Sequence, residues 1–398
     1  MRIGLLTTSF PRSADDVPGQ FVRGFARALT ARGHQVDVLA PAPLERQYVD
    51  PPHEPNLSVE WLRYLAPRSL QRTFYGAGVL DNLRATPLAA LGLAPFTLAL
   101  AVAAHAHMPS WDAVVSHWAL PCALVAGELC RGRPHLAVLH SADVFALESL
   151  PTAALRRVLA TRLARRADTL LFSSRELRRR FLALLAPLAR AELAGVAHVC
   201  PMGVEPAAEP GEPRAALRER LQLDRFTVLS LGRLIALKGI AHAIDAVAKL
   251  PNSELLICGD GPLRSELERH ASRSGARVRF LGNVFGAAKT ELFRAADAFV
   301  LPSIQLPSGR TEGMPQTLLE AMEHGLPVVA SDVGGVSDVV RSDENGFLVA
   351  PGEAHAIAAA LRSLLDPATQ SRLSKGAHAT AKLYHWDELA PLLESLLI

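Results

Sequence analysis

The sequence predicts an α/β protein of two doubly wound, Rossmann-like domains, each built on a parallel sheet. Three observations support this prediction. A chain of 398 residues is long enough for two domains with separate cores. Short apolar runs alternate with amphipathic stretches, which is the pattern of βαβ units. The alternation stops at a stretch rich in Pro, Glu and Ala, residues 205–213, and then begins again.

The first domain is expected over residues 1–204. It opens with a strand at 2–7, a loop rich in turn residues at 9–19, a helix at 20–31 that ends before Gly33, and a strand at 35–40. Further strands are expected at 113–116, 136–140, 169–173 and 196–199. This order predicts a parallel sheet with helical crossovers.

The second domain is expected over residues 214–378, after the linker at 205–213, and residues 379–398 form a separate terminal segment with an amphipathic helix at 386–398. The expected strands are 227–231, 254–258, 277–281, 298–301, 328–330 and 346–349, and the expected helices are 240–249, 263–274, 289–295 and 316–324. Strands and helices again alternate, so a second parallel sheet is predicted.

Composition describes an ordinary folded protein, with 49% apolar and 20% charged residues, and excludes a disordered chain. Cys122, Cys130, Cys200 and Cys258 lack metal-ligand spacing and are expected to be core residues of a cytoplasmic protein. The opening MRIGLLTTSF turns polar after one basic residue, so it predicts a strand and not a signal peptide.

Two stretches raise the question of a membrane. Residues 87–108 are nearly free of charge and close to the length of a span, but Pro95 and two histidines interrupt them, so we expect a buried helix. The region from Arg156 to Arg180 is rich in arginine interleaved with apolar residues. It could contact an anionic membrane from the inner face, or its arginines could face water beside paired acids. No nucleic-acid-binding motif accompanies it, and no nucleic acid partner is expected.

Two glutamates, Glu312 and Glu320, flank the start of the helix at 316–324. Pro315 suits a first helical position, and the free backbone N–H groups around Gly313, Met314 and Gln316 suit a phosphate. A carboxylate accepts two hydrogen bonds and therefore suits sugar hydroxyls. The pattern fits a nucleotide sugar; the alternative is that both glutamates are solvated helix charges.

Two cations and several glycines follow predicted strands. Arg233 and Lys238, in the run Gly232 to Gly239 after the strand at 227–231, could neutralise a diphosphate leaving group; the alternative is two surface cations. Gly259 and Gly261, after the next strand, and Gly19, before the first helix, allow a ligand close to the backbone. Each of these three glycines could equally be a turn residue.

Four further residues lie after strands of the first half. His140 and Asp143 follow the strand at 136–140, and His117 and Trp118 follow the strand at 113–116. A single histidine at a strand end is more often structural than catalytic, and a tryptophan there often packs in the core. From the residues alone both possibilities stay open.

Together these motifs resemble the retaining, GT-B-fold glycosyltransferases of the GT4 group. Glu312, seven residues and Glu320, in EGMPQTLLEAMEHGLPVVASDVGG, resemble the E-x7-E signature. The other segments resemble the G-R-x4-K-G, G-x-G-P, H-G-x-D and H-W-x-x-P elements of the group, with Ser141 in place of the usual glycine.

The resemblance implies an active site in a cleft between two domains, with a terminal helix that crosses back to the first. Arg233 and Lys238 would hold the donor phosphates, Glu320 the ribose and Glu312 the hexose, while Gly259 and Gly261 would line the nucleotide site. His140 would face the donor sugar, Gly19 would approach the donor phosphates or the acceptor, and His117, Trp118 and Asp143 would lie on the acceptor side.

The expected function is therefore retaining transfer of a hexose from a nucleotide sugar, in bacterial polysaccharide or glycolipid synthesis. A uridine donor is preferred over a guanosine donor, and the acceptor is a saccharide or is lipid-linked. No D-x-D motif follows a strand, so no metal or other cofactor is expected. A nucleotide-sugar epimerase and a non-catalytic, membrane-attached scaffold that binds nucleotide sugars remain as alternatives.

Overall fold

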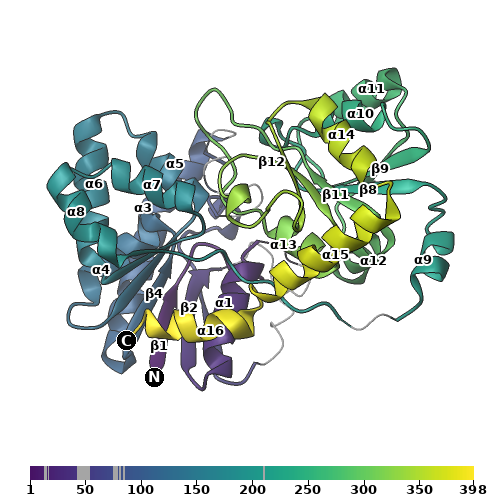
Figure 1. Cartoon of the computed structure of the whole chain (residues 1–398). Helices are drawn as coiled ribbons and strands as arrows, with labels where there is room; N and C mark the ends of the chain where they lie inside the picture. Colours follow the sequence, from purple (N-terminus) through teal and green to yellow (C-terminus); the bar gives the residue numbers. More distant parts are fainter. Residues whose placement is uncertain are drawn as a thin grey trace. The chain divides into compact units, whose positions relative to one another are not determined.

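The computed structural model describes residues 1–12, 16, 18–42, 54–74, 79, 82–83, 86–208 and 211–398. The chain separates into two compact units: unit 1 is Met1–Gly203 with Trp386–Ile398, and unit 2 is Val204–His385 (Figure 1). Each unit has a parallel sheet with helices on both faces, as the sequence predicts. The expected linker at 205–213 lies within unit 2, and residues 209–210 of it fall outside the described residues.

The sheet of unit 1 has seven strands within the described residues, in the order β3-β2-β1-β4-β5-β6-β7. The strands are β1 (Arg2–Leu6), β2 (Gln35–Pro41), β3 (Leu57–Leu62), β4 (Ala113–His117), β5 (His135–Leu139), β6 (Thr169–Phe172) and β7 (Ala197–Val199). Since β1 lies between β2 and β4, the chain winds outward in both directions from β1. This is the doubly wound topology.

Strand β3 is absent from the elements predicted from the sequence. This strand pairs with β2 along its whole length, from Leu57 opposite Val36 to Leu62 opposite Pro41. It is an edge strand whose residues, apart from Leu62, are half-buried or exposed. It therefore lacks the continuous apolar run by which the other strands were found.

Helices cover both faces of the unit 1 sheet. In β5, Leu136 and Val138 point into a core shared with α1 and α16, whereas Ala137 and Leu139 point into a core with helices on the other face. This alternation follows from the two-residue repeat of a strand. The helices are α1 (Gln20–Ala31), α3 (Leu93–His107), α4 (Leu124–Leu129), α5 (Ser141–Glu148), α6 (Ala153–Arg166), α7 (Arg175–Ala183), α8 (Pro187–Leu193) and α16 (Trp386–Ser395).

Helix α16 packs closely on α1 although the two are at opposite ends of the chain (Figure 1). The contact depends on Gly24 and Gly203, because a Cβ atom on Gly24 would lie 2.2 Å from Nε1 of Trp386 and one on Gly203 would lie 2.5 Å from its ring. Trp386 is 6% exposed and stacks edge-on against Phe25. The tryptophan thus fixes the end of the chain to unit 1.

The apolar stretch after residue 86 forms the 3-10 helix η2 (Pro87–Gly92) and α3. Phe96, Leu100 and Ala104 of α3 are fully buried against the sheet. Of the 18 consecutive residues that are most apolar in this stretch, however, only 33% are buried. By length and composition the stretch could cross a membrane. The sequence predicts a buried helix here. One side of α3 is buried as predicted, whereas the other side is exposed.

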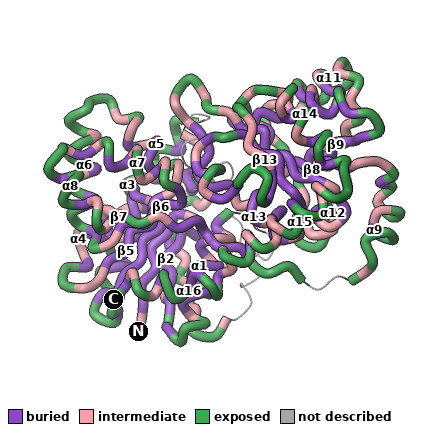
Figure 2. Tube along the Cα trace, in the orientation of Figure 1, coloured by how far each residue is buried: buried purple, intermediate pink, exposed green. Residues whose placement is uncertain are grey.

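The sheet of unit 2 has six strands in the order β10-β9-β8-β11-β12-β13 among the described residues. The strands are β8 (Phe226–Leu231), β9 (Ser253–Cys258), β10 (Val278–Gly282), β11 (Ala298–Leu301), β12 (Val328–Ser331) and β13 (Gly346–Val349). The helices are α9 (Arg214–Arg220), α10 (Ile240–Val247), α11 (Arg264–Ser274), α12 (Gly286–Ala295), α13 (Gln316–Glu323), α14 (Ala354–Ser363) and α15 (Pro367–Lys382). Helices α12, α13 and α15 cover one face, and α10, α11 and α14 cover the other. Strands β8 and β9 between them are mostly buried (Figure 2).

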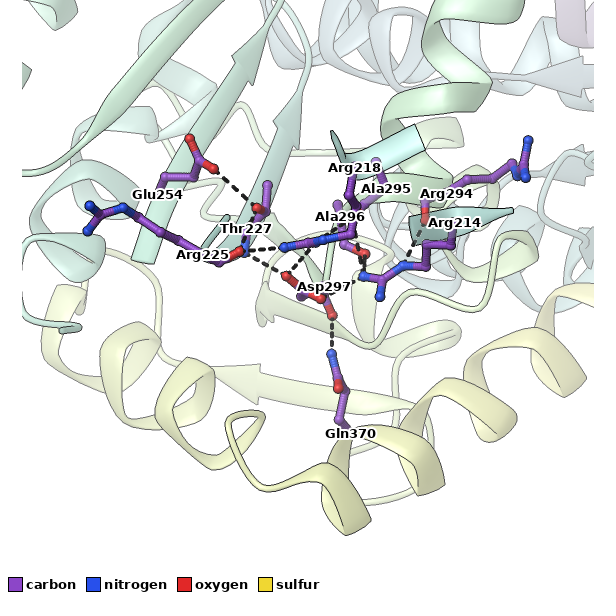
Figure 3. Close-up of polar contacts among 10 residues, drawn as sticks. All are labelled: Arg214, Arg218, Arg225, Thr227, Glu254, Arg294, Ala295, Ala296, Asp297 and Gln370. Atoms are coloured by element: carbon purple, nitrogen blue, oxygen red, sulfur yellow. Dashed lines mark hydrogen bonds and ion pairs between the residues drawn. The ribbon is translucent and has the colours of Figure 1, made fainter. Parts of the chain in front are cut away.

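Asp297, just before β11, joins several elements of unit 2 (Figure 3). Its carboxylate accepts hydrogen bonds from Arg214 at 2.6 Å, Arg218 at 3.0 Å and the backbone N–H of Thr227 at 2.8 Å. The same arginines also donate to the carbonyls of Ala295 and Ala296 at the end of α12. Free carbonyls at a helix end favour cations, so this cluster ties α9 to α12 and β8.

Candidate functional site

Four loops meet at the carboxyl edge of the unit 2 sheet, after β8, β9, β11 and β12. The loops after β8 and β9 are hydrogen-bonded, from Gly232 N–H to Cys258 O and from Leu234 N–H to Asp260 O, each at 2.9 Å. A Cβ atom on Gly259, whose φ is +129°, would lie 1.9 Å from the carbonyl oxygen of Gly232. A Cβ on Gly261 would likewise meet the backbone of Leu234 at 2.5 Å. Both glycines thus have a structural role, which is to let these loops pack together.

An ion pair joins the loops after β8 and β11. Nζ of Lys238 lies 2.7 Å from Oε1 of Glu312, and the two side chains are 16% and 9% exposed. The hydroxyl of Ser303 donates to the same oxygen at 2.7 Å. The structure therefore brings together a predicted phosphate-binding cation and a predicted sugar-binding carboxylate.

The neighbouring residues hold this pair in place. The backbone N–H of Ile304 donates to Leu237 O at 2.9 Å, and Gly335 N–H donates to Gly313 O at 2.8 Å. A Cβ on Gly334, whose φ is +59°, would lie 2.0 Å from the carbonyl oxygen of Glu312. The hydroxyl of Thr311, which is 4% exposed, has no hydrogen-bond partner among the described residues. Thr311 thus places an unsatisfied buried hydroxyl next to Glu312 in the chain.

The remaining donor-side residues surround this pair. Arg233 is half-buried directly after β8, in the turn where its carbonyl accepts from Ile235 N–H at 2.9 Å. Met314 is buried and belongs to the core cluster under α13. Pro315 is the N-cap and not the first helical residue, so that prediction was wrong by one position; Gln316 begins the helix. The cause is the extended conformation of Pro315, with ψ of 116°.

Glu320 projects from the second turn of α13 and is paired with Lys289, a residue that was not predicted to belong to the site. Nζ of Lys289, on α12, lies 2.8 Å from Oε1 of Glu320, and both side chains are about one-third exposed (31% and 28%). Nothing in the local sequence around Lys289 indicates this contact. The packing of α12 beside α13 on one sheet face brings the two residues together.

In unit 1, His117 and His140 form a stacked pair at the carboxyl ends of β4 and β5. Their rings lie 5.4 Å apart at an angle of 10°, and Nδ1 of His117 lies 3.1 Å from Nε2 of His140. Phe25 meets the ring of His117 edge-on at 4.9 Å, and Phe21 meets His140 at 4.9 Å. Burial lowers the pKa of His117 well below its ordinary value and that of His140 to about 3. Both histidines are therefore neutral at physiological pH.

His117 is fully buried, and its Nε2 has no hydrogen-bond partner among the described residues. Its ring contacts the rings of His140 and Phe25. Trp118 is half-buried with φ of +72°, and its ring lies 5.0 Å from that of His140.

Asp143 is 7% exposed and caps the start of α5, where its carboxylate accepts the backbone N–H of His140 at 2.8 Å. Burial raises its pKa to about 8. Gly19 is the N-cap of α1, with φ of +84°, and a Cβ there would lie 2.7 Å from the backbone of Ser9. Both residues thus have a structural role, and their roles toward a ligand stay predictions.

All four cysteines are buried and free, which confirms their prediction as core residues. Burial raises the pKa of each thiol, to about 12 for Cys258. Within the described ranges, no group of three or more His, Cys, Asp or Glu side chains could hold a metal ion.

Two family models match the chain, one in each part. Residues 18–197 match the glycosyl transferase 4-like domain, and residues 214–380 match the glycosyl transferases group 1. The chain belongs to the glycosyltransferases. The second match contains Arg233, Lys238, Glu312 and Glu320, and the first contains the histidine pair.

Named relatives agree with this membership. The lipopolysaccharide core biosynthesis glycosyltransferase LpsD of Rhizobium meliloti is 35% identical over 181 residues, which cover 44% of this chain and 50% of that protein. The glycogen synthase of Mycobacterium tuberculosis is 28% identical over 395 residues, 95% of this chain and 89% of that protein. The alignments with three of the curated relatives, LpsD among them, span half of those relatives' length or less.

The solved structures of similar fold include HepE of Anabaena, in complex with UDP. It has a TM-score of 0.73 and 22% identity, and the match covers 100% of this chain and 99% of that chain. This likeness, with the two parallel-sheet units, confirms the predicted GT-B fold of the glycosyltransferase.

Proposed function

We propose that this glycosyltransferase moves a hexose from a nucleoside diphosphate sugar to an acceptor hydroxyl, with retention of the anomeric configuration, as a GT4 enzyme. The observation that carries the proposal is the ion pair of Lys238 and Glu312 at the carboxyl edge of the unit 2 sheet. In open parallel sheets ligands bind at this edge. A cation for the diphosphate and a carboxylate for the sugar lie there within hydrogen-bonding distance.

The residues have separate roles in this proposal. Arg233 and Lys238 bind the diphosphate and stabilise the charge that develops on it as the sugar departs. Glu312 accepts hydrogen bonds from the hexose, and Glu320 accepts them from the ribose. Because Lys238 already neutralises Glu312, the incoming diphosphate must take Lys238 from the carboxylate. Glu312 is then left to the hydroxyls of the sugar.

Unit 1 supplies the acceptor side. His140 acts as a neutral hydrogen-bonding group, since burial keeps it uncharged, and Trp118 offers an apolar ring beside it. The proposed acceptor is a saccharide or a lipid-linked sugar in bacterial polysaccharide or glycolipid synthesis. We propose UDP-sugars over GDP-sugars as donors, and a cytoplasmic protein that works at the inner face of an anionic membrane. HepE, bound to UDP, supports the first of these choices.

Calorimetric titration with UDP, GDP, UDP-glucose and GDP-mannose tests the donor site. We expect UDP to bind, and Arg233→Ala and Glu320→Gln to weaken it at least tenfold. Lys249→Ala, on an exposed lysine of the same unit, is the matched control and should bind as the wild type does. A folded wild-type protein that binds none of the four ligands contradicts the donor site.

Product analysis tests the reaction. With an α-linked donor, NMR of the product should show an α-glycosidic bond; a β-linked product refutes retention. Conversion of the donor hexose to its epimer without transfer favours the epimerase, and binding with no chemistry on any acceptor favours the scaffold.

A further inference from the structure

We infer that the exposed side of η2 and α3 is a docking surface for an anionic lipid bilayer. The inference deepens the proposed function, since a lipid-linked acceptor requires the enzyme at a membrane, and it rests on that proposal. The surface, called the α3 face, consists of the exposed side chains Leu88, Leu91, Leu98 and Val102 with Leu70 of the adjacent 3-10 helix η1 (Arg68–Leu70).

The α3 face is apolar to an unusual degree. Leu88, Leu91, Leu98 and Val102 are 69%, 58%, 66% and 62% exposed. The last three recur seven and four residues apart, so they lie along one stripe of the helical surface. Residues 85–111 include no Asp, Glu, Lys or Arg. Single exposed leucines are common in soluble proteins, but a continuous stripe marks an interaction site.

The opposite side of α3 explains why the helix lies on the protein and does not cross the bilayer. Phe96 is fully buried and packs against the rings of Tyr64 at 5.3 Å and Phe74 at 4.3 Å. Leu100 and Ala104 are fully buried in the same cluster. To span the membrane the helix would have to leave this core, whereas an amphipathic contact needs the exposed side alone.

The charges around the α3 face favour anionic lipid as its partner. Arg68 and Arg72 flank the exposed Leu70, and neither makes an ion pair with a described residue; Arg72 is exposed, whereas Arg68 is half-buried with its Nη1 covered. Their loop is fixed to η2, because the Thr73 hydroxyl donates to Ala89 O at 2.7 Å. At the other end of α3, Nε2 of His107 lies 2.7 Å from Oε2 of the nearby carboxylate Glu60. Apolar side chains beside unpaired arginines bind anionic interfaces.

The arginine-rich region from Arg156 to Arg180 is the competing surface in the same unit. Its charge is largely balanced: Arg162 lies 2.9 Å and Arg166 3.6 Å from Glu128, and Arg165 lies 3.2 Å from Glu192. Arg179 and Arg180 pair with Glu176 and Glu148, and Arg156 and Arg178 donate to backbone carbonyls. This arrangement matches the alternative of paired surface arginines.

A second protein copy fits the α3 face less well. A stable protein interface involves about 20–30 residues on each side, whereas the α3 face consists of five apolar side chains, with two arginines beside it. Insertion into a lipid interface needs no complementary surface, so this small number is sufficient for reversible binding.

Vesicle co-sedimentation tests the inference on the full chain. Vesicles of phosphatidylethanolamine with 30% phosphatidylglycerol are compared with pure phosphatidylcholine, for the wild type, Leu98→Glu/Val102→Glu and Arg72→Glu. The matched control is Leu155→Glu/Val158→Glu on α6, where the side chains are 45% and 65% exposed. Calorimetric UDP binding is measured on every sample, so that failure of the donor site is seen separately.

We expect the wild type to bind the anionic vesicles. The α3 double variant should bind them at least fivefold less than the wild type, and Arg72→Glu at least twofold less. Binding of the α6 control should differ from that of the wild type by less than twofold. Loss of binding in the α6 control alone would assign docking to the arginine-rich region and overturn the inference. Absence of wild-type binding to anionic vesicles also overturns it. A dimer that the α3 variant converts to monomer, with unchanged vesicle binding, would make the α3 face an interface between copies.

Discussion

Removal of Lys238 should destabilise unit 2 more than removal of both members of its ion pair. Lys238 and Glu312 are 16% and 9% exposed, so Lys238→Met leaves a buried carboxylate without its cation. Removal of one partner of a buried pair costs about 3–5 kcal/mol. Because Ser303 still donates to Glu312, we expect the lower end, about 3 kcal/mol.

Differential scanning calorimetry measures this effect. For a domain of this size about 1 kcal/mol corresponds to roughly 2–4 °C, so Lys238→Met should lower the Tm of the unit 2 transition by about 6–12 °C. In Lys238→Met/Glu312→Gln neither charge remains. Neutral replacement of a buried pair is often tolerated, so we expect the double variant to regain more than half of the loss.

Two controls separate stability from chemistry. Lys249→Met, on an exposed lysine, should leave the Tm within about 1 °C, as surface substitutions do. Sugar transfer should be lost in Lys238→Met and also in the more stable double variant. A Tm of Lys238→Met within 2 °C of the wild type would refute the argument that the pair is buried and coupled.

Four further predictions concern other parts of the molecule. Asp297→Asn should lower the Tm of unit 2 by several degrees, because Arg214 and Arg218 lose the carboxylate with which both are paired. The control is Asp224→Asn, at a side chain that is 69% exposed. Gly24→Ala should destabilise unit 1 by about 1–3 kcal/mol through overpacking against Trp386, and an unchanged urea midpoint would contradict this contact. The histidine pair should make unit 1 less stable as pH falls from about 6.5 toward 3, because the unfolded chain binds protons that the buried rings exclude. Asp143, with its pKa raised to about 8, has the opposite sign, since its contribution is complete below its ordinary value of 3.8 and is lost as pH rises through 8. Asp143→Asn should therefore flatten the decline of Tm between pH 6.5 and 8, and an equal decline in both proteins would refute the assignment.

The sequence by itself determined the fold class and most of its elements. The strand at 298–301 and the helix at 20–31 begin and end in the structure where the pattern predicts. The physical reason is that buried parallel strands are short and apolar, and that helices between them repeat their apolar residues every three to four positions. Glu312, Glu320 and the two cations after β8 were found for a similar reason, because they occupy short segments that follow core strands.

The tertiary structure alone decided the contacts of those residues. The pairing of Lys238 with Glu312 depends on the adjacency of β8 and β11, and that of Lys289 with Glu320 on the packing of α12 beside α13. Strand order also buries His117 behind His140, although the sequence gives both the same setting after a strand. Likewise, the sequence reveals the apolar stretch of α3, but the fold determines which of its sides is covered. Long-range packing is not encoded in local periodicity, and for that reason these contacts could not be predicted from the sequence.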